Sequence, residues 1–361
     1  VLIQKFTTLF KDVTRQGTKI PKEEYLTHGK NIIIDQGQDI IAGYTNCEDG
    51  IFKKIPAIVF GDHTRIIKYV DTPFFLGADG VKVLKCTDKN ANYRYLYYAL
   101  KNAHIPNTGY NRHFKWLKEI TINYPDKNRQ NDIVNILDKL EYIIKMKSQE
   151  LDKFDELIKA RFVEMFGDPQ DSKSKWKKST IEKCCTLKSG KTLPRNIENE
   201  GGNIPYVKVK DMNSLENTTY ITTSTRFVSD KTANKSIFPV GTVIFPKRGG
   251  AIGTNKKRLT KVPICADLNI MGVIPDNTRI SSYYLFEYFN MVDLNTLNNG
   301  SSVPQINNKD INPLNINIPP LSLQNEFANF VHQVDKSKVA VQKSLDETQK
   351  LFDSLMQEYF G

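Results

Sequence analysis

The residue types best suited to contact a ligand lie in four short segments, two in each half of the chain. In PKRGGAIGTNKKR (246–258), glycines alternate with lysines and arginines. Glycine lets a backbone approach a phosphate closely, and arginine can reach guanine through two hydrogen bonds. PQINNK (304–309) offers Gln and Asn, which pair with adenine, while GDHTRIIK (61–68) and GYNRHFK (109–115) mix basic, aromatic and amide residues.

A plain surface or turn role explains any one of these residues equally well. As clusters in two matching places, however, they predict a DNA-binding surface, with lysines and arginines that supply salt-dependent phosphate contacts. The predicted DNA-binding residues are His63, Thr64, Arg65, Lys68, Tyr110, Asn111, Arg112, His113, Lys115, Lys247, Arg248, Thr254, Asn255, Lys256, Lys257, Arg258, Gln305 and Asn307.

Residue patterns required for catalysis are missing from the sequence. An adenine-N6 methyltransferase needs an Asn/Asp-Pro-Pro-aromatic loop and a Gly-rich cofactor turn, and neither occurs. The Gly-Lys-Thr of SGKTLP has Cys185 where a phosphate-binding loop needs its first glycine. The five cysteines and five histidines show no zinc spacing. We therefore predict a non-catalytic chain without a metal or cofactor of its own, with reduced thiols, in the cytoplasm.

Positive charge is concentrated in two parts of the 361-residue chain, whose net charge is +11. Residues 1–121 hold 18 Lys and Arg against 12 Asp and Glu, and residues 169–315 hold 21 against 12. Residues 122–168 and 316–361 are slightly acidic. This partition predicts two polyanion-binding blocks separated by nearly neutral segments. No apolar run reaches the roughly 18 residues of a membrane span.

The two acidic segments repeat each other at an offset of 194 residues, without a gap over 46 positions. Within each segment the helix-patterned part begins with Gln-Asn, at 130 and 324, and ends with Phe-Gly, at 166 and 360. Apolar residues recur at steps of four and three from Ile133 to Met165 and from Phe327 to Tyr359, which predicts a heptad seam on two long helices. Prolines precede both helices, and Gly167 ends the first.

A helix of about 40 residues is roughly 60 Å long, so it needs a partner along its length. The simplest partner is the other copy, packed antiparallel because the block between them can return the chain. Two unrelated surface helices and two homodimerising coiled coils are the alternatives.

The basic blocks also echo each other. QGTKIP resembles SGKTLP, and an apolar strand, a basic loop, a second strand and a helix-like stretch follow in both blocks. We predict an α+β chain with two similar mixed α/β domains, an antiparallel pair of long coiled-coil helices and a pseudo-twofold internal repeat. The predicted boundaries are 1–121 for the first block, 122–168 for the first helix, 169–315 for the second block and 316–361 for the second helix.

With this organisation, the chain resembles the DNA-sequence specificity subunits of Type I restriction-modification systems. TGYNRHFKWLKEITINYP and SVPQINNKDINPLNINIPP resemble the ends of that family's target-recognition domains. PLSLQNEFANFVHQVDKSKVAVQKSLDETQKLFDSLMQEYFG resembles its terminal helix. The resemblance covers essentially the whole chain and makes the blocks target-recognition domains separated and followed by spacer helices.

The resemblance implies recognition of a bipartite double-stranded DNA target by a non-catalytic subunit. Two modification (methyltransferase) subunits would bring S-adenosylmethionine, and restriction (motor-nuclease) subunits would bring ATP and Mg²⁺. Equating Gly17 with Gly190 places the counterpart of Trp176 near Ile3, so we expect a short N-terminal piece to be absent or processed.

Two other functions remain open at this point. One is a coiled-coil scaffold with two basic protein-binding heads. Salt-dependent binding to a bipartite duplex would favour a specificity subunit over this scaffold. The other is an autonomous DNA-cutting or DNA-modifying enzyme, which would form product from duplex with Mg²⁺ and S-adenosylmethionine without partners.

Overall fold

A computed structural model describes residues 2–77, 79–169, 174–198, 200–234, 236–297 and 303–361. The chain divides into two units, which we call unit 1 (residues 1–149 and 342–361) and unit 2 (residues 150–341). Each unit therefore contains one mixed block and a part of both long helices, α4 (Lys127–Phe166) and α10 (Leu321–Phe360). Among the described residues, no helix combines the length and the apolar character that crossing a membrane requires.

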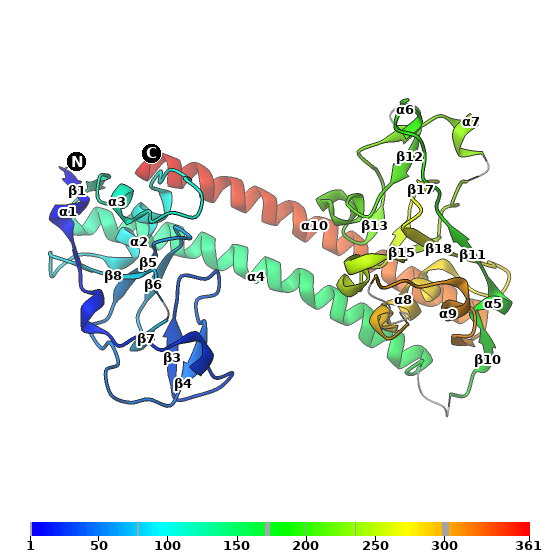
Figure 1. Cartoon of the computed structure of the whole chain (residues 1–361), viewed down its shortest axis with the longest axis horizontal. Coiled ribbons are helices and arrows are strands. Elements are labelled where there is room, and N and C mark those ends of the chain that lie inside the picture. The colour runs from blue at the N-terminus through cyan, green and yellow to red at the C-terminus, as the bar shows by residue number, and fades with distance from the viewer. Residues whose placement is uncertain (1, 78, 170–173, 199, 235, 298–302) are drawn as a thin grey trace. The chain divides into compact units, whose positions relative to one another are not determined.

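The elements of each block follow one another as labelled in Figure 1. The block of unit 1 contains β1 (Leu2–Lys5), α1 (Phe6–Leu9), β2 (Phe10–Asp12), η1 (Thr14–Gln16), η2 (Lys22–Glu24), β3 (Asn31–Ile34), β4 (Gly43–Thr45), β5 (Ala57–Gly61), β6 (Ile67–Val70), β7 (Phe74–Leu76), β8 (Val81–Cys86), α2 (Tyr93–Asn102), α3 (Phe114–Leu117) and β9 (Thr121–Tyr124). The block of unit 2 contains β10 (Lys177–Thr180), α5 (Ile181–Cys184), β11 (Cys185–Ser189), α6 (Arg195–Glu198), β12 (Ile204–Val207), η3 (Asp211–Asn213), η4 (Leu215–Asn217), β13 (Tyr220–Ile221), β14 (Phe227–Val228), α7 (Asp230–Ala233), β15 (Val243–Pro246), η5 (Gly249–Thr254), β16 (Arg258–Thr260), β17 (Cys265–Ala266), β18 (Ile270–Pro275), α8 (Ser282–Met291), η6 (Leu294–Leu297), α9 (Asn308–Ile311) and β19 (Asn315–Ile318).

The two blocks share one topology. The larger sheet has the order β2-β8-β5-β6 in unit 1 and β11-β18-β15-β16-β13 in unit 2. In the smaller sheet, β3 pairs parallel with β7 and antiparallel with β4, as β12 pairs with β17 and β14. Central strands β5 and β15 are buried at every position, which explains their continuous apolar sequences. The structure therefore repeats the fold as well as the sequence pattern.

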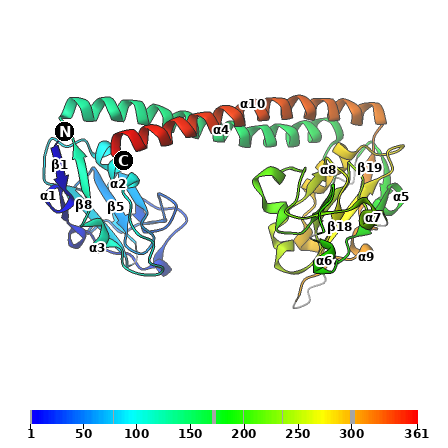
Figure 2. The same cartoon turned by 90° about the horizontal axis from the view of Figure 1, so that it is seen from above.

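One helix in each block packs between the larger sheet and the long helices, α2 in unit 1 and α8 in unit 2 (Figure 2). Side-chain acceptors cap both N-termini, from Asn92 and from Ser281. Tyr95 Oη donates to Asn123 O at 2.7 Å, and Tyr284 Oη donates to Asn317 O at 2.9 Å. These matched bonds tie each helix to the strand that enters the following long helix.

The repeated Gln-Asn has a structural role that the sequence pattern did not reveal. Gln130 Oε1 accepts from Asn92 N at 3.1 Å, and its amide donates to Pro125 O at 2.9 Å. Gln324 likewise accepts from Ser281 N at 2.7 Å and donates to Pro319 O at 2.9 Å. Both glutamines are buried, and each links a backbone N–H at the start of α2 or α8 to a backbone carbonyl before the following long helix.

Within each unit the segments of α4 and α10 run antiparallel, because residues later in α4 meet residues earlier in α10. The contacts that show this are Arg129 with the ring of Tyr359 and Lys147 with Ser344 in unit 1, and Asp155 with Lys338 and Arg161 with Glu326 in unit 2.

The predicted heptad seam is wrong at the C-terminal ends of both helices. On α4 the buried residues are Phe162 and Phe166, whereas the seam predicted Met165, which is half-buried. On α10 the predicted seam residue Phe352 is buried, but Met356 is buried next instead of the predicted Leu355, which is half-buried. Steps of four replace the alternation of four and three because each end packs into a domain core as well as against the other helix, which needs a wider apolar face.

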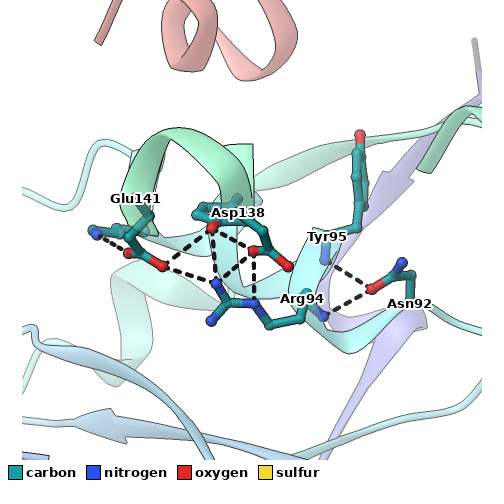
Figure 3. A network of polar contacts seen from close by, with 7 residues as sticks. Asn92, Arg94, Tyr95, Asp138 and Glu141 are labelled. Atoms are coloured by element: carbon teal, nitrogen blue, oxygen red, sulfur yellow. Dashed lines mark hydrogen bonds and ion pairs between the residues drawn. The ribbon is translucent and has the colours of Figure 1, made fainter. Parts of the chain in front are cut away.

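A charged cluster fastens α2 to α4 in unit 1 (Figure 3). The Arg94 guanidinium donates to Asp138 Oδ1 at 2.5 and 3.0 Å and to Glu141 Oε2 at 2.8 Å. Its planar group also lies 5.2 Å from the ring of Tyr69 on β6. Burial lowers the pKa of Arg94, but the hydrogen bonds to Asp138 and Glu141 raise it more, so the net pKa lies above its usual value. The charge is thus held between sheet and helix at any pH at which the domain folds.

Candidate nucleic-acid interface

The loop after β5 in unit 1 is pinned by its buried first residue, Asp62. Its backbone carbonyl accepts from His113 N at 2.8 Å, and its carboxylate accepts from Phe114 N at 2.7 Å. His113 is itself fully buried and places Nδ1 3.0 Å from the same carbonyl. The loop 62–66 and the start of α3, about fifty residues later, therefore form one surface. This joins the two predicted segments of unit 1, GDHTRIIK and GYNRHFK.

Two stacked aromatic rings lie on this surface. The rings of His63 and Tyr110 lie 4.7 Å apart and 9° from parallel, and Tyr110 is 87% exposed. Arg65 has a left-handed backbone (φ 64°) and donates to Ile105 O at 3.1 Å, so its side chain supports the neighbouring loop. The predicted residues that face solvent here are Thr64, Tyr110, Asn111, Arg112 and Lys115.

The corresponding loop of unit 2 follows β15 and is joined in the same way to the segment before α9. Arg248 forms an antiparallel bridge with Gln305, and Gly249 N donates to Pro304 O at 2.8 Å. Ile306 N donates to Lys247 O at 2.9 Å. The predicted segments PKRGGAIGTNKKR and PQINNK thus also lie together, although residues 300–302 before the second segment are outside the described residues.

The backbone of η5 is open to an approaching ligand. A Cβ built at Gly249 or Gly250 would meet nothing within 4 Å, and one at Gly253 would meet only Asn295 Oδ1 at 3.9 Å, counting contacts among the described residues. Gly249 also has a left-handed φ of 68°, which favours glycine. Arg248 beside it is exposed. A duplex backbone can therefore come close to this loop while the Arg248 guanidinium reaches a base edge.

Several predicted residues point inward instead. Lys68, His113 and Lys257 are buried, and Arg258 is half-buried with Nε 2.5 Å from Asn217 O. Lys68 Nζ donates to Asp39 O at 2.5 Å, and burial lowers its pKa although Asp35 opposes the shift. Burial also lowers the pKa of Lys257 to about 8 and that of Arg258 below its usual value. These four residues support the surface, and contact with DNA stays a prediction for the exposed ones.

Other predicted residues shape the loops of unit 2 through hydrogen bonds. Lys247 Nζ donates to Ser189 Oγ at 2.7 Å, and burial together with Arg248 lowers the Lys247 pKa. Thr254 Oγ1 donates to Ala251 O at 2.7 Å. The remaining contacts join Lys256 Nζ to Asn213 Oδ1, Gln305 Nε2 to Asn307 Oδ1, and Asn307 to Asp310 in a capping box at the start of α9.

Sequence reasoning missed the partners that hold these loops. In unit 1, Gln36 accepts from His63 N at 3.2 Å through Oε1, and its backbone carbonyl accepts from Thr64 Oγ1 at 2.7 Å. Ser189 and Asn213 hold lysines of unit 2. Gln36 follows β3, Ser189 is the last residue of β11 and Asn213 is the last residue of η3, and no pattern in one sequence shows that these residues contact the loops. Within the described residues, no group of three or more His, Cys, Asp and Glu is arranged to hold a metal.

Two domains of one topology carry exposed loops at corresponding places, with basic, amide and aromatic side chains in unit 1 and basic and amide side chains beside bare glycines in unit 2, as expected of a duplicated DNA-binding protein. The family model of the Type I restriction modification DNA specificity domain matches residues 8–153 and 173–348. The chain belongs to this family and is a specificity subunit of a Type I restriction-modification system, a non-catalytic DNA-recognition subunit that works with methyltransferase and restriction subunits. The predicted family, fold class and non-catalytic role are thereby confirmed.

Two characterised relatives are similar over most or much of the chain. The specificity subunit of the Type I restriction enzyme EcoR124I/EcoR124II from Escherichia coli is 24% identical over 330 residues, covering 84% of this chain and 79% of that protein. The specificity subunit of the Type I restriction enzyme MjaIX from Methanocaldococcus jannaschii is 22% identical over 263 residues, covering 66% of this chain and 60% of that protein.

Solved structures share the fold at low sequence identity. The S subunit of the Type I restriction-modification system of M. genitalium matches with a TM-score of 0.61 and 19% identity, covering 100% of this chain and 96% of that one. A chain from a structural study of complex assembly and conformational transition of the type I R-M system matches with a TM-score of 0.57 and 14% identity, covering 99% and 97%.

Proposed function

We propose that each unit reads one half of a bipartite double-stranded DNA target. The observation that carries this proposal is the junction found in both units, where the loop after the central strand meets the segment before a short helix. The residues involved are far apart in sequence, yet they meet at the same place in the repeated topology. A duplicated reader on one chain suits two half-sites, as a symmetric dimer suits a palindrome.

The two surfaces offer different reading chemistry. In unit 2, the exposed Arg248 beside a bare glycine loop is suited to guanine, with Gln305 next to it. In unit 1, Tyr110 and Asn111 are exposed, and Arg112 and Lys115 supply positive charge for phosphates. We therefore expect the halves of the target to differ in base sequence, and binding to weaken as salt rises.

The chain's role in this proposal is to bring catalytic partners to the target. Two modification (methyltransferase) subunits would carry S-adenosylmethionine, and restriction (motor-nuclease) subunits would carry ATP and Mg²⁺. The membership in a family of recognition subunits supports this division of labour. This chain would contribute affinity and sequence choice, and its partners the chemistry.

Exchange of one recognition block tests the proposal. Residues 169–315 are replaced by the matching block of a relative with a different target, and adenine methylation is then sequenced in cells that carry the partner subunits. One half of the methylated sequence should change while the other half stays the same. The reciprocal exchange of residues 1–121 is the control and should change the other half. A simultaneous change of both halves in either exchange would refute independent reading.

A further inference from the structure

Two side chains at the end of the loop 247–256 of unit 2, which we call its reading loop, form a compact polar cluster. Asn255, at the end of η5, has a left-handed backbone with φ 52°. Its Oδ1 accepts from Leu294 N at 2.9 Å and from Lys257 Nζ at 2.7 Å. Lys257 Nζ also donates to Val292 O at 2.6 Å. We call Asn255 and Lys257, with these bonds to residues 292–294, the Asn255–Lys257 clamp.

Lys257 lies inside the domain, whereas Asn255 is half-buried at the end of the loop. Lys257 is 4% exposed, and two acceptors already occupy its ammonium group. Pulling it out toward a phosphate would remove this donor from Asn255 Oδ1 and from the carbonyl of Val292, and breaking both hydrogen bonds is costly. The ammonium group of Lys257 therefore holds the loop in place through these hydrogen bonds.

The clamp holds one flank of the reading loop and leaves the opposite flank to a separate contact. At the start of the loop, Arg248 bridges Gln305 and Gly249 N donates to Pro304 O. At its end, the clamp ties Asn255 to Leu294. Between these two anchors run the bare glycines of η5 and Ile252, whose side chain is buried in the core of unit 2. The position of Arg248 relative to a base thus depends on both anchors.

We propose that Lys257 and Asn255 are positioning residues for sequence discrimination by unit 2, acting through the reading loop and not by touching DNA. This inference rests on the proposed function, because it assumes that the loop 247–256 reads one half-site. Loosening the clamp lets the loop sample more conformations, which weakens the correct base contacts more than contacts with phosphate, since a phosphate contact tolerates displacement and a base contact does not.

The described residues of unit 1 form no equivalent clamp at the corresponding place, which supplies an internal control. Lys68 pairs with Val59 across β6 and β5, and Arg258 pairs with Ile244 across β16 and β15, at corresponding places in the two sheets. The residue before Lys68 is Ile67, whereas the residue before Arg258 is Lys257. Unit 1 pins its loop through Asp62 instead. Changes to the clamp should therefore affect one half-site alone.

Three variants separate the clamp from the fold of the loop. Lys257→Met removes the ammonium group and keeps a long apolar side chain in a buried site. Asn255→Gly removes the side-chain acceptor but suits the left-handed backbone, so the turn itself is retained. Asn255→Asp keeps an acceptor at the same place and adds a charge that attracts Lys257. The double variant Lys257→Met/Asn255→Gly tests whether the two residues act together.

The measurement is the equilibrium affinity of the chain assembled with its methyltransferase subunits, for the cognate duplex and for duplexes altered in one half-site, over a range of salt concentrations. Lys257→Met and Asn255→Gly should lower discrimination at the unit 2 half-site by roughly tenfold, within the range that loss of one bidentate base contact spans. Discrimination at the other half-site and the slope of log affinity against log salt should not change. Asn255→Asp should retain most discrimination, and the double variant should match the worse single variant.

Different failures point to different errors. If Lys257→Met weakens all duplexes alike and lowers the salt slope by about one, Lys257 contacts a phosphate and the positioning role is refuted. If both half-sites lose discrimination, or if none changes, the clamp has no specific role. Arg248→Ala checks the underlying function. If Arg248→Ala lowers discrimination and Lys257→Met does not, only the positioning role of the clamp is refuted. If neither variant lowers discrimination, the proposal that this loop reads a half-site is refuted as well.

Discussion

The two units place different side chains on the same framework. The second residue after the central strand is His63 in unit 1 and Arg248 in unit 2. His63 is stacked under an exposed tyrosine, whereas Arg248 stands beside glycines that leave the backbone bare. Elements that hold the blocks to the long helices are repeated with their hydrogen bonds, as Gln130 and Gln324 show. The repeat thus conserves how a reading loop is presented and varies what it presents.

The anchors of the loops differ as much as the loops themselves. Unit 1 uses the buried carboxylate of Asp62, which accepts from the start of α3. Unit 2 uses a backbone bridge at Arg248 on one flank and the Asn255–Lys257 clamp on the other. Each loop is therefore held by a different set of side chains from its own block. Exchange of whole blocks should preserve both together, whereas grafting a loop alone should not.

The largest expected difference between the units concerns the ends of the long helices. Phe166 is 3% exposed and lies 4.8 Å from the ring of Tyr284, while its repeat equivalent Phe360 is half-buried 5.2 Å from Tyr95. We expect Phe166→Ala to lower the free energy of unfolding of unit 2 by about 3–5 kcal/mol through cavity formation. Phe360→Ala should lower that of unit 1 by about 1–2 kcal/mol, because less apolar area is lost.

The two tryptophans allow each unit to be followed separately during this unfolding. Trp116 lies in unit 1, and Trp176 lies in unit 2, where its Nε1 donates to Phe166 O at 2.9 Å. Urea unfolding is measured by fluorescence in Trp116→Phe and Trp176→Phe backgrounds, which leave one reporter each. Equal losses from Phe166→Ala and Phe360→Ala would mean that the two helix ends are buried alike, against the structure.

Buried Lys257 predicts a pH dependence of the stability of unit 2. Its pKa in the folded chain is lowered by burial to about 8, from 10.5 when exposed. A lowered lysine pKa means that the charged form costs stability below pH 8, and that this cost disappears as the pH rises from about 8 to about 10.5. We expect the free energy of unfolding to rise by about 1–3 kcal/mol over this interval.

Comparison with Lys257→Met isolates this titration from the tyrosines and other lysines that ionise over the same range. The difference in the unfolding free energy of unit 2 between the parent and the variant is measured from pH 7 to pH 10.5, with Trp176 as the reporter. The parent should gain relative to the variant as pH rises. A constant difference would show that the Lys257 ammonium is charged throughout, with a solvated environment that the burial does not suggest.

Much of this architecture could be predicted from the sequence, because its signals are periodic or repeated. The long helices follow from apolar spacing, and β5 and β15 follow from short apolar runs before basic loops. The predicted seam was wrong where Phe162 and Phe166 pack into the core of unit 2. A heptad pattern describes contacts with one partner helix, and these residues contact several elements. Local periodicity carries no information about that second contact.

The candidate site was predictable by composition but not by geometry. The sequence named four segments, whose contact with DNA stays a prediction, and it could not separate exposed Arg248 from buried Lys257, since both are basic residues in one segment. It also could not identify Gln36, because its contacts with the loop of unit 1 join residues 27 and 28 positions apart that only the folded chain brings together. Burial of a charge depends on which remote acceptors the fold supplies, and these lie up to 35 residues away for Lys257.

Truncation of the reading side chains should affect one half-site each. Arg248→Ala should lower discrimination at the half-site of unit 2 by about 1–3 kcal/mol, the range for a bidentate contact with guanine. Tyr110→Ala in unit 1 should act on the other half-site, by removing the exposed ring that stacks on His63. Affinities are compared for duplexes altered in each half-site. If Arg248→Ala weakens every duplex equally, Arg248 reads no base.

The smallest effect is expected for lysines that neutralise phosphate. Lys115 in unit 1 is exposed, and Lys256 in unit 2 is half-buried with Nζ held by Asn213. A phosphate contact carries no sequence information, so Lys115→Ala and Lys256→Ala should each weaken cognate and altered duplexes by the same factor, roughly a few-fold at moderate salt. Each should also lower the slope of log affinity against log salt by at most about one unit.

Because Asn213 already holds Lys256, this lysine must exchange a hydrogen bond to reach a phosphate, and its effect should be the smaller of the two. Asn213→Ala frees Lys256 and should leave affinity unchanged or raise it slightly. Salt titrations with cognate and unrelated duplexes measure both slopes in the assembled complex. A change in discrimination between half-site variants on loss of Lys256 would move it from the group of phosphate contacts to the group that shapes the reading loop, alongside Lys257.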